Sequence, residues 1–169
     1  RRFLRVVAGD EPPRFTEGSG RLELARALVR ADNPLVSRVI VNRVWQHYFG
    51  RGIVASSSNF GVTGERPTHP LLLDWLASRL VEQSWSLKSL HRQILLSETY
   101  QRSLRHDARN AALDGSNQWL WRMNRRRLDI EGYRDSLLAI SGELDRAMGG
   151  PAHGDLFASR RRTLYGAVH

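Results

Sequence analysis

One stretch of the sequence, residues 34–49, restricts the possible folds more than any other. Its apolar residues would cover nearly every side of a helix: Leu35, Val36, Val39, Ile40, Val41, Val44, Trp45, Tyr48 and Phe49. A helix without a polar half belongs in the middle of a bundle. Several of these residues are β-branched, however, and would also suit a strand.

The residues at the two ends of this stretch favour a helix. Asn33 can accept a hydrogen bond from the first turn. Pro34 suits that turn because it lacks an N–H that would otherwise stay unpaired. Gly50 follows the last apolar residue, and glycine is common at the C-terminal end of helices. We therefore predict a central helix over residues 34–49.

Further helices are predicted where apolar residues recur at helical spacing. They begin near Ser19, at His69–Pro70 and after Ser86, and a last one covers about 125–148. The last helix has apolar residues spaced alternately by three and four: Ile130, Tyr133, Leu137, Ile140, Leu144 and Met148. Gly142 inside it would cost about 1 kcal/mol relative to alanine, so packing must hold that helix.

These elements together predict a mainly α fold, an irregular bundle of about five helices. Residues 50–68 are rich in Gly, Ser and Asn and should form a long ordered loop. Residues 1–18, with their Gly and Pro, are predicted to be a leading segment or linker, and residues 19–169 a single helical domain. The final residues, 162–168, are expected to be extended.

The charge balance is strongly basic, with a formal net charge of +9. Nearly all of the cations are arginine, Lys88 being the one lysine, and they are spread along the chain. Runs occur at Arg125–Arg127 and Arg160–Arg162. Nucleic-acid binding through such clusters is an alternative, but charge without a motif is a weak indication, and we do not expect it.

Cysteine is absent from the sequence. That excludes disulfides, thiolate metal sites and covalent haem attachment within these residues, so we expect no cofactor here. No apolar run approaches the roughly 20 residues that span a bilayer. The histidines at 47, 69 and 91 lack the close spacing of a metal pair, and we expect no metal site.

The candidate site lies where polar residues interrupt the predicted central helix and the loop after it. Its residues are Asn42, Arg43, His47, Asn59 and His69. Buried polar groups need partners, so the simplest role of Asn42 and Arg43 is to bind backbone groups of the 50–68 loop. The alternative is an enzyme or carbohydrate-binding site in the 42–69 region, with Arg43, His47 and His69 nearest to it.

Two other patterns have ordinary structural explanations. Glu131 and Asp135 are one helical turn apart, as coupled carboxylates require, but Arg127 and Arg134 lie within a turn of them and favour ion pairs. The five tryptophans could stack on sugars, but aromatic residues at helical spacing more often belong to the core. No catalytic motif is present.

Several clusters of uncommon residues occur in a fixed order along the chain. They are Asn33-Pro34-Leu35, Val41-Asn42-Arg43-Val44-Trp45, Phe49-Gly50-Arg51-Gly52, Thr68-His69-Pro70, Leu73-Asp74-Trp75-Leu76, Trp85-Ser86-Leu87-Lys88 and Trp121-Arg122-Met123-Asn124. In these clusters the sequence resembles a planctomycete-type domain of unknown function. That domain forms the C-terminal part of large proteins that often carry an N-terminal c-type cytochrome module.

The resemblance implies a cell-envelope, extracytoplasmic setting and other domains of the same polypeptide as partners, a c-type cytochrome module among them. Members of that family continue beyond the region of Arg162–Tyr165, so we expect the domain to be truncated here at its C-terminus. The resemblance implies no catalytic residue. We therefore expect an interaction or scaffold domain of a larger, redox-associated or degradative protein.

Overall fold

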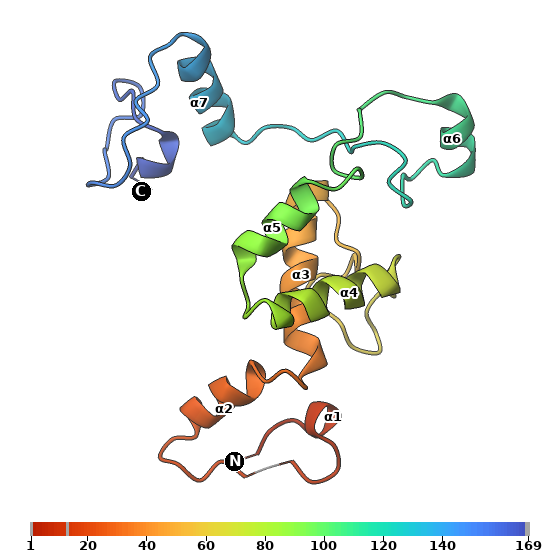
Figure 1. Cartoon of the computed structure of the whole chain (residues 1–169). Helices are drawn as coiled ribbons and strands as arrows, with labels where there is room; N and C mark the ends of the chain where they lie inside the picture. Colours follow the sequence, from red (N-terminus) through yellow and green to blue (C-terminus); the bar gives the residue numbers. More distant parts are fainter. Residues whose placement is uncertain (1, 13, 168–169) are drawn as a thin grey trace. The chain divides into compact units, whose positions relative to one another are not determined.

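The computed structural model describes residues 2–12 and 14–167, which fall into two compact units. Unit 1 is Arg1–Asn124 and unit 2 is Arg125–His169. The helices of unit 1 are α1 (Arg5–Ala8), α2 (Arg21–Leu28), α3 (Pro34–Phe49), α4 (Pro70–Glu82), α5 (Leu87–Leu95) and α6 (Ala108–Leu113). Unit 2 contains α7 (Ile130–Ile140) and the 3-10 helix η1 (Thr163–Tyr165) (Figure 1).

The mainly α prediction is confirmed, since the described residues form helices joined by loops and only isolated β-bridges. The assignment of residues 1–18 to a linker and of 19–169 to one domain stays a prediction. Helix α2 starts close to Ser19, as predicted, with Gly20 at its N-cap position and Arg21 as its first residue.

Helix α3 has the ends that the sequence predicts. The side chain of Asn33 accepts a hydrogen bond from the Leu35 amide at 3.1 Å, and Pro34 is the first helical residue. At the other end, the Gly50 amide donates to the carbonyl of Gln46 at 2.8 Å. Asn33 also donates to the Leu28 carbonyl at 3.0 Å, which ties α3 to the end of α2.

The apolar core of unit 1 lies among α3, α4 and α5, which pack against one another (Figure 1). Its buried residues are Val41, Trp45, Phe49, Ile53, Val54, Leu73, Leu76, Ala77, Leu80, Leu90 and Ile94. The central position of α3 is thus as predicted. In α4 the buried residues are Leu73, Leu76, Ala77 and Leu80, whereas Trp75, one of the tryptophans attributed above to the core, is 51% exposed.

Helix α7 is much shorter than the predicted helix over 125–148. The Asp129 carboxylate accepts the Gly132 amide at 2.7 Å and starts the helix at Ile130. After Ser141 the chain turns at Gly142, whose φ of +77° is left-handed. The amides of Gly142 and Glu143 then bond back to the carbonyls of Ala139 and Leu138, which is a Schellman end. Leu144 and Met148, which continue the apolar spacing, therefore lie outside the helix.

The last residues of unit 2 also differ from expectation. Residues 162–168 were predicted to be extended, but Thr163–Tyr165 form η1, which packs against α7. Val168 lies outside the described residues. The segment is held by two isolated bridges, Asp145 with Arg161 and His153 with Gly166.

Candidate functional site

Asn42 braces the loop after α3, as one of the two sequence interpretations required. Its side chain is fully buried, with its Nδ2 donating to the Val54 carbonyl at 2.9 Å and its Oδ1 accepting the Val54 amide at 2.8 Å. A Cβ at Gly52 would lie 2.7 Å from Nδ2 of Asn42, so glycine allows this close approach. The side-chain nitrogen and oxygen of Asn42 both bond to Val54, so Asn42 ties the start of the loop to α3.

Arg43 and His47 lie on the exposed side of α3. Arg43 was expected to bind backbone groups of the loop, but within the described residues its side chain makes no hydrogen bond or ion pair. The three predicted site residues of α3 therefore divide into one buried brace, Asn42, and two that face away from the core.

Asn59 organises its own part of the loop. Its Oδ1 accepts the Gly61 amide at 3.0 Å, and its Nδ2 donates to the Thr63 hydroxyl at 3.0 Å. The hydroxyl of Ser56 donates to the Asn59 carbonyl at 2.8 Å and accepts the Glu65 amide at 2.8 Å. These bonds make the 50–68 loop ordered, as expected, but they do not place Asn59 in a pocket.

His69 lines a small cleft of about 40 Å³ beside the start of α4. Its Nδ1 lies 2.9 Å from the Thr68 hydroxyl, and the Thr68 amide donates to the Ile53 carbonyl at 2.9 Å. The cleft is lined by Trp45, Arg51, Gly52, Ile53, Thr68, His69, Ser116, Asn117, Gln118, Leu120 and Asn124. Of the five predicted site residues, the other four are not in its lining.

Asn117 and Asn124 are site residues that the sequence interpretation missed. Asn117 is buried and donates to the Arg122 carbonyl at 2.9 Å and to Oδ1 of Asn124 at 2.8 Å. Asn124 donates in turn to the carbonyl of Phe49 at 2.9 Å, the last residue of α3. Residues 117–124 are thereby fixed beside α3. The one available signal was Asn117 itself, since asparagine tolerates the positive φ of 55° found there.

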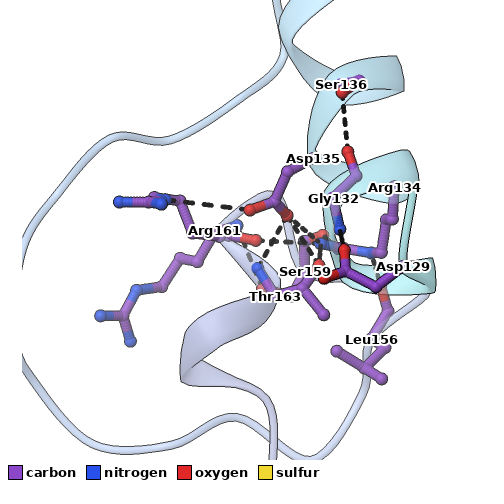
Figure 2. Close-up of polar contacts among 10 residues, drawn as sticks. Asp129, Gly132, Arg134, Asp135, Ser136, Leu156, Ser159, Arg161 and Thr163 are labelled. Atoms are coloured by element: carbon purple, nitrogen blue, oxygen red, sulfur yellow. Dashed lines mark hydrogen bonds and ion pairs between the residues drawn. The ribbon is translucent and has the colours of Figure 1, made fainter. Parts of the chain in front are cut away.

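A second region of interest is the polar side of α7, where Arg134 binds the following loop (Figure 2). Its guanidinium donates to the carbonyls of Leu156 at 2.9 Å and Arg161 at 3.0 Å, to the Thr163 hydroxyl at 2.9 Å, and to the carbonyl of Ser159. The side chain is only 19% exposed. One arginine therefore holds most of the 156–163 loop against α7.

Asp135 completes this cluster and carries a perturbed pKa. Its Oδ1 accepts the Thr163 amide at 2.8 Å and the Thr163 hydroxyl at 2.7 Å (Figure 2). Burial alone would raise the pKa of Asp135, but the bonds from Thr163 and the charges of Arg134 and Arg162 outweigh it and lower the pKa. The expected Arg134–Asp135 ion pair is present at 3.6 Å.

The opposite side of α7 is apolar and faces solvent. Ile130, Tyr133, Leu137 and Ile140 are between 51% and 85% exposed. The sequence analysis expected packing to hold this helix, whereas in the structure these four side chains are exposed, and α7 turns Arg134 and Asp135 toward its own unit. We call these four side chains the α7 apolar face.

The described residues contain neither a cluster suited to a metal ion nor a helix suited to a membrane. No three His, Asp or Glu side chains among them converge as a metal ion would require. Within that same part of the chain, no helix is both long enough and apolar enough to cross a lipid bilayer.

Comparison with known proteins assigns the chain to a family. The family model described as PSD1, a protein of unknown function (DUF1553), matches residues 20–164, which is most of the sequence. The chain belongs to this family. Neither the curated proteins nor the solved structures yielded a match.

Proposed function

We propose that this chain is an interaction domain that docks against another domain of the same polypeptide through the α7 apolar face. The observation that carries the proposal is the orientation of α7. Its charged residues contact its own unit, whereas Ile130, Tyr133, Leu137 and Ile140 face outward. An exposed apolar patch of this kind marks an interaction surface more often than an ordinary part of a surface.

The spacing of the face fits recognition by a groove. The four residues occupy positions i, i+3, i+7 and i+10 of one helix. Helices that bind in apolar grooves use anchors at this spacing, because such positions share one side of the helix. The aromatic ring of Tyr133 adds a large contact area at low conformational cost.

The lack of buried residues in unit 2 also supports the proposal that another domain packs against it. None of residues 125–167 is buried, so apolar packing within the unit contributes little to its stability. A second folded domain that covered the α7 apolar face would supply this missing burial. An intramolecular partner is favoured because linkage raises the effective concentration of even a modest interface.

The resemblance described above supports a more specific proposal about the partner. We propose that the chain acts as a scaffold within a larger cell-envelope protein, and that the docked domain is associated with a c-type cytochrome module. This part of the proposal depends on the resemblance.

The experiment uses this chain and the remainder of its polypeptide, produced separately and mixed. Leu137→Glu places a charge in the α7 apolar face and should weaken their association at least tenfold, since desolvating an unpaired charge is costly. Binding is measured by isothermal titration calorimetry.

The matched control is Leu113→Glu, which changes a leucine of α6 that is even more exposed, 80% against 51% for Leu137. It should leave the affinity unchanged. The proposal is wrong if the two parts do not associate, or if both variants weaken binding equally.

A further inference from the structure

Trp119 is an exposed aromatic residue beside the cleft that His69 lines. Its side chain is 65% exposed, and its ring meets the His69 ring edge-on at 5.4 Å between centroids. Its chain neighbours Gln118 and Leu120 both line the cleft. An indole exposed to this degree contributes little to the apolar core. Most of its surface is accessible to a ligand.

The backbone that carries Trp119 is held in a fixed conformation. The Asp114 carboxylate accepts the amides of Gln118 at 2.9 Å and Trp119 at 2.7 Å. Asn117 and Leu120, on either side, have positive φ values of 55° and 52°. Such strained residues persist only where surrounding contacts impose them, and they cluster at binding sites. The backbone therefore holds the attachment point of the ring in one place beside the cleft, which favours binding.

The polar groups of the cleft favour an anion. Arg51 has five N–H donors, and its one ion pair, with Glu65, is a loose contact at 3.5 Å between half-exposed side chains. His69 uses Nδ1 toward the Thr68 hydroxyl, and its Nε2, which has no hydrogen bond within the described residues, can donate to an anion in the tautomer or the protonated ring that carries a proton there. The Gln118 side chain is likewise without a hydrogen bond in that part of the chain. These groups can bind a carboxylate.

The size of the cleft limits what can enter it. A water molecule needs roughly 10–15 Å³ of such space, so 40 Å³ admits about three waters or one small substituent. A complete sugar ring does not fit. A ring that lay on Trp119 could, however, extend one carboxyl group into the cleft.

We propose that Trp119 and the adjoining cleft bind a uronate unit of an acidic saccharide. The weakly positive C–H groups on one face of the pyranose stack on the negative face of the indole. The carboxylate enters the cleft toward Arg51 and His69, and Gln118 binds a ring hydroxyl. This site belongs to unit 1 and does not depend on the α7 apolar face.

The test measures binding of oligogalacturonate to the chain by calorimetry, with two comparison ligands. The fully methyl-esterified oligosaccharide keeps the sugar rings and lacks the charge. Polyglutamate keeps the charge and lacks the rings. We expect oligogalacturonate to bind at least tenfold more tightly than either.

Three variants separate the site from general effects of charge and aromatic surface. Trp119→Ala should weaken binding at least tenfold, and Arg51→Gln about fivefold or more with a smaller dependence on salt. Trp75→Ala removes an exposed tryptophan on α4 that does not line the cleft, and it should change nothing. The proposal is overturned if polyglutamate binds equally well, if Trp75→Ala and Trp119→Ala have the same effect, or if oligogalacturonate does not bind at millimolar concentration.

Discussion

The two units of this chain are stabilised in opposite ways. In unit 1, apolar side chains from α3, α4 and α5 are buried, and Asn42 has both of its polar ends satisfied inside that core. In unit 2, the side chains of Arg134 and Asp135 are only 19% and 20% exposed, and the α7 apolar face is more exposed than either. The same residue types therefore occupy opposite positions in the two units.

This difference indicates how each unit depends on its surroundings. Buried apolar area contributes about 25 cal/mol per Å², a gain that unit 1 obtains from its own residues. Unit 2 depends on hydrogen bonds, whose net contribution is only about 1 kcal/mol each, or more when one partner is charged. We therefore expect unit 1 to be stable alone and unit 2 to gain stability from a partner.

The largest predicted effect comes from Asn42→Ala in unit 1. It leaves the amide and the carbonyl of Val54 buried without partners, at about 1–3 kcal/mol for each group. The free energy of unfolding from urea titration should fall by about 2–6 kcal/mol. The control Asn59→Ala alters an exposed asparagine of the same loop and should cost about 1 kcal/mol or less. Equal costs would mean that Asn42 is not the brace.

The next effect concerns Arg134 in unit 2. Arg134→Met keeps the apolar stem and removes every bond to the 156–163 loop, which should cost about 2–4 kcal/mol of local stability. Hydrogen exchange at the amides of His153 and Ala167 should accelerate, whereas exchange in α4 stays constant. Arg127→Met, at an exposed arginine, should alter neither. Unchanged exchange rates in Arg134→Met would contradict the claim that the hydrogen bonds of Arg134 stabilise unit 2.

Gly142→Ala tests the end of α7. No atom lies within 4 Å of an added Cβ, so the cost is that of a left-handed alanine, about 1–2 kcal/mol. Gly142→Asn should cost less, because asparagine tolerates this conformation better. Exchange at the Glu143 amide provides the measurement. If Gly142→Ala lengthened α7 without loss of stability, the Schellman end would be incidental.

Acidification should weaken the contacts that Asp135 makes within unit 2. The pKa of Asp135 is lower in the folded state, so its stabilisation is present above the ordinary value near 3.9 and is lost as pH falls through the lower folded value. The amide resonance of Thr163 should therefore shift between about pH 4 and lower values. Asp135→Asn should remove this pH dependence and cost about 1 kcal/mol. A resonance with the same pH dependence in Asp135→Asn would assign the effect to another group.

The sequence predicted unit 1 better than unit 2, for a physical reason. In α3 the cap Asn33, the first-turn Pro34 and the final Gly50 agree with the apolar pattern between them. The residues that begin and end α3 and the apolar residues that pack in the core therefore favour the same helix. The role of Asn42 followed from the same reasoning, because a polar residue inside an apolar helix must find a partner.

In unit 2 the apolar periodicity was misleading. Apolar spacing shows which residues share a helix side, but it does not show whether that side is covered by the same unit. Gly142 was taken as a residue inside the helix, whereas its left-handed conformation ends it. The cleft at His69 was only partly predictable, because Asn117 and Trp119 reach it through a turn and not through a helical repeat.

Hydroxyl-radical footprinting of the chain alone tests the opposite arrangement of the two units most directly. It compares side chains of one type in both units, Leu137 with Leu80 and Ile140 with Ile94. We predict rapid labelling of Leu137 and Ile140 and strong protection of Leu80 and Ile94. Protection of Leu137 and Ile140 equal to that of the core residues would contradict the outward orientation of α7 and the interaction surface proposed for it.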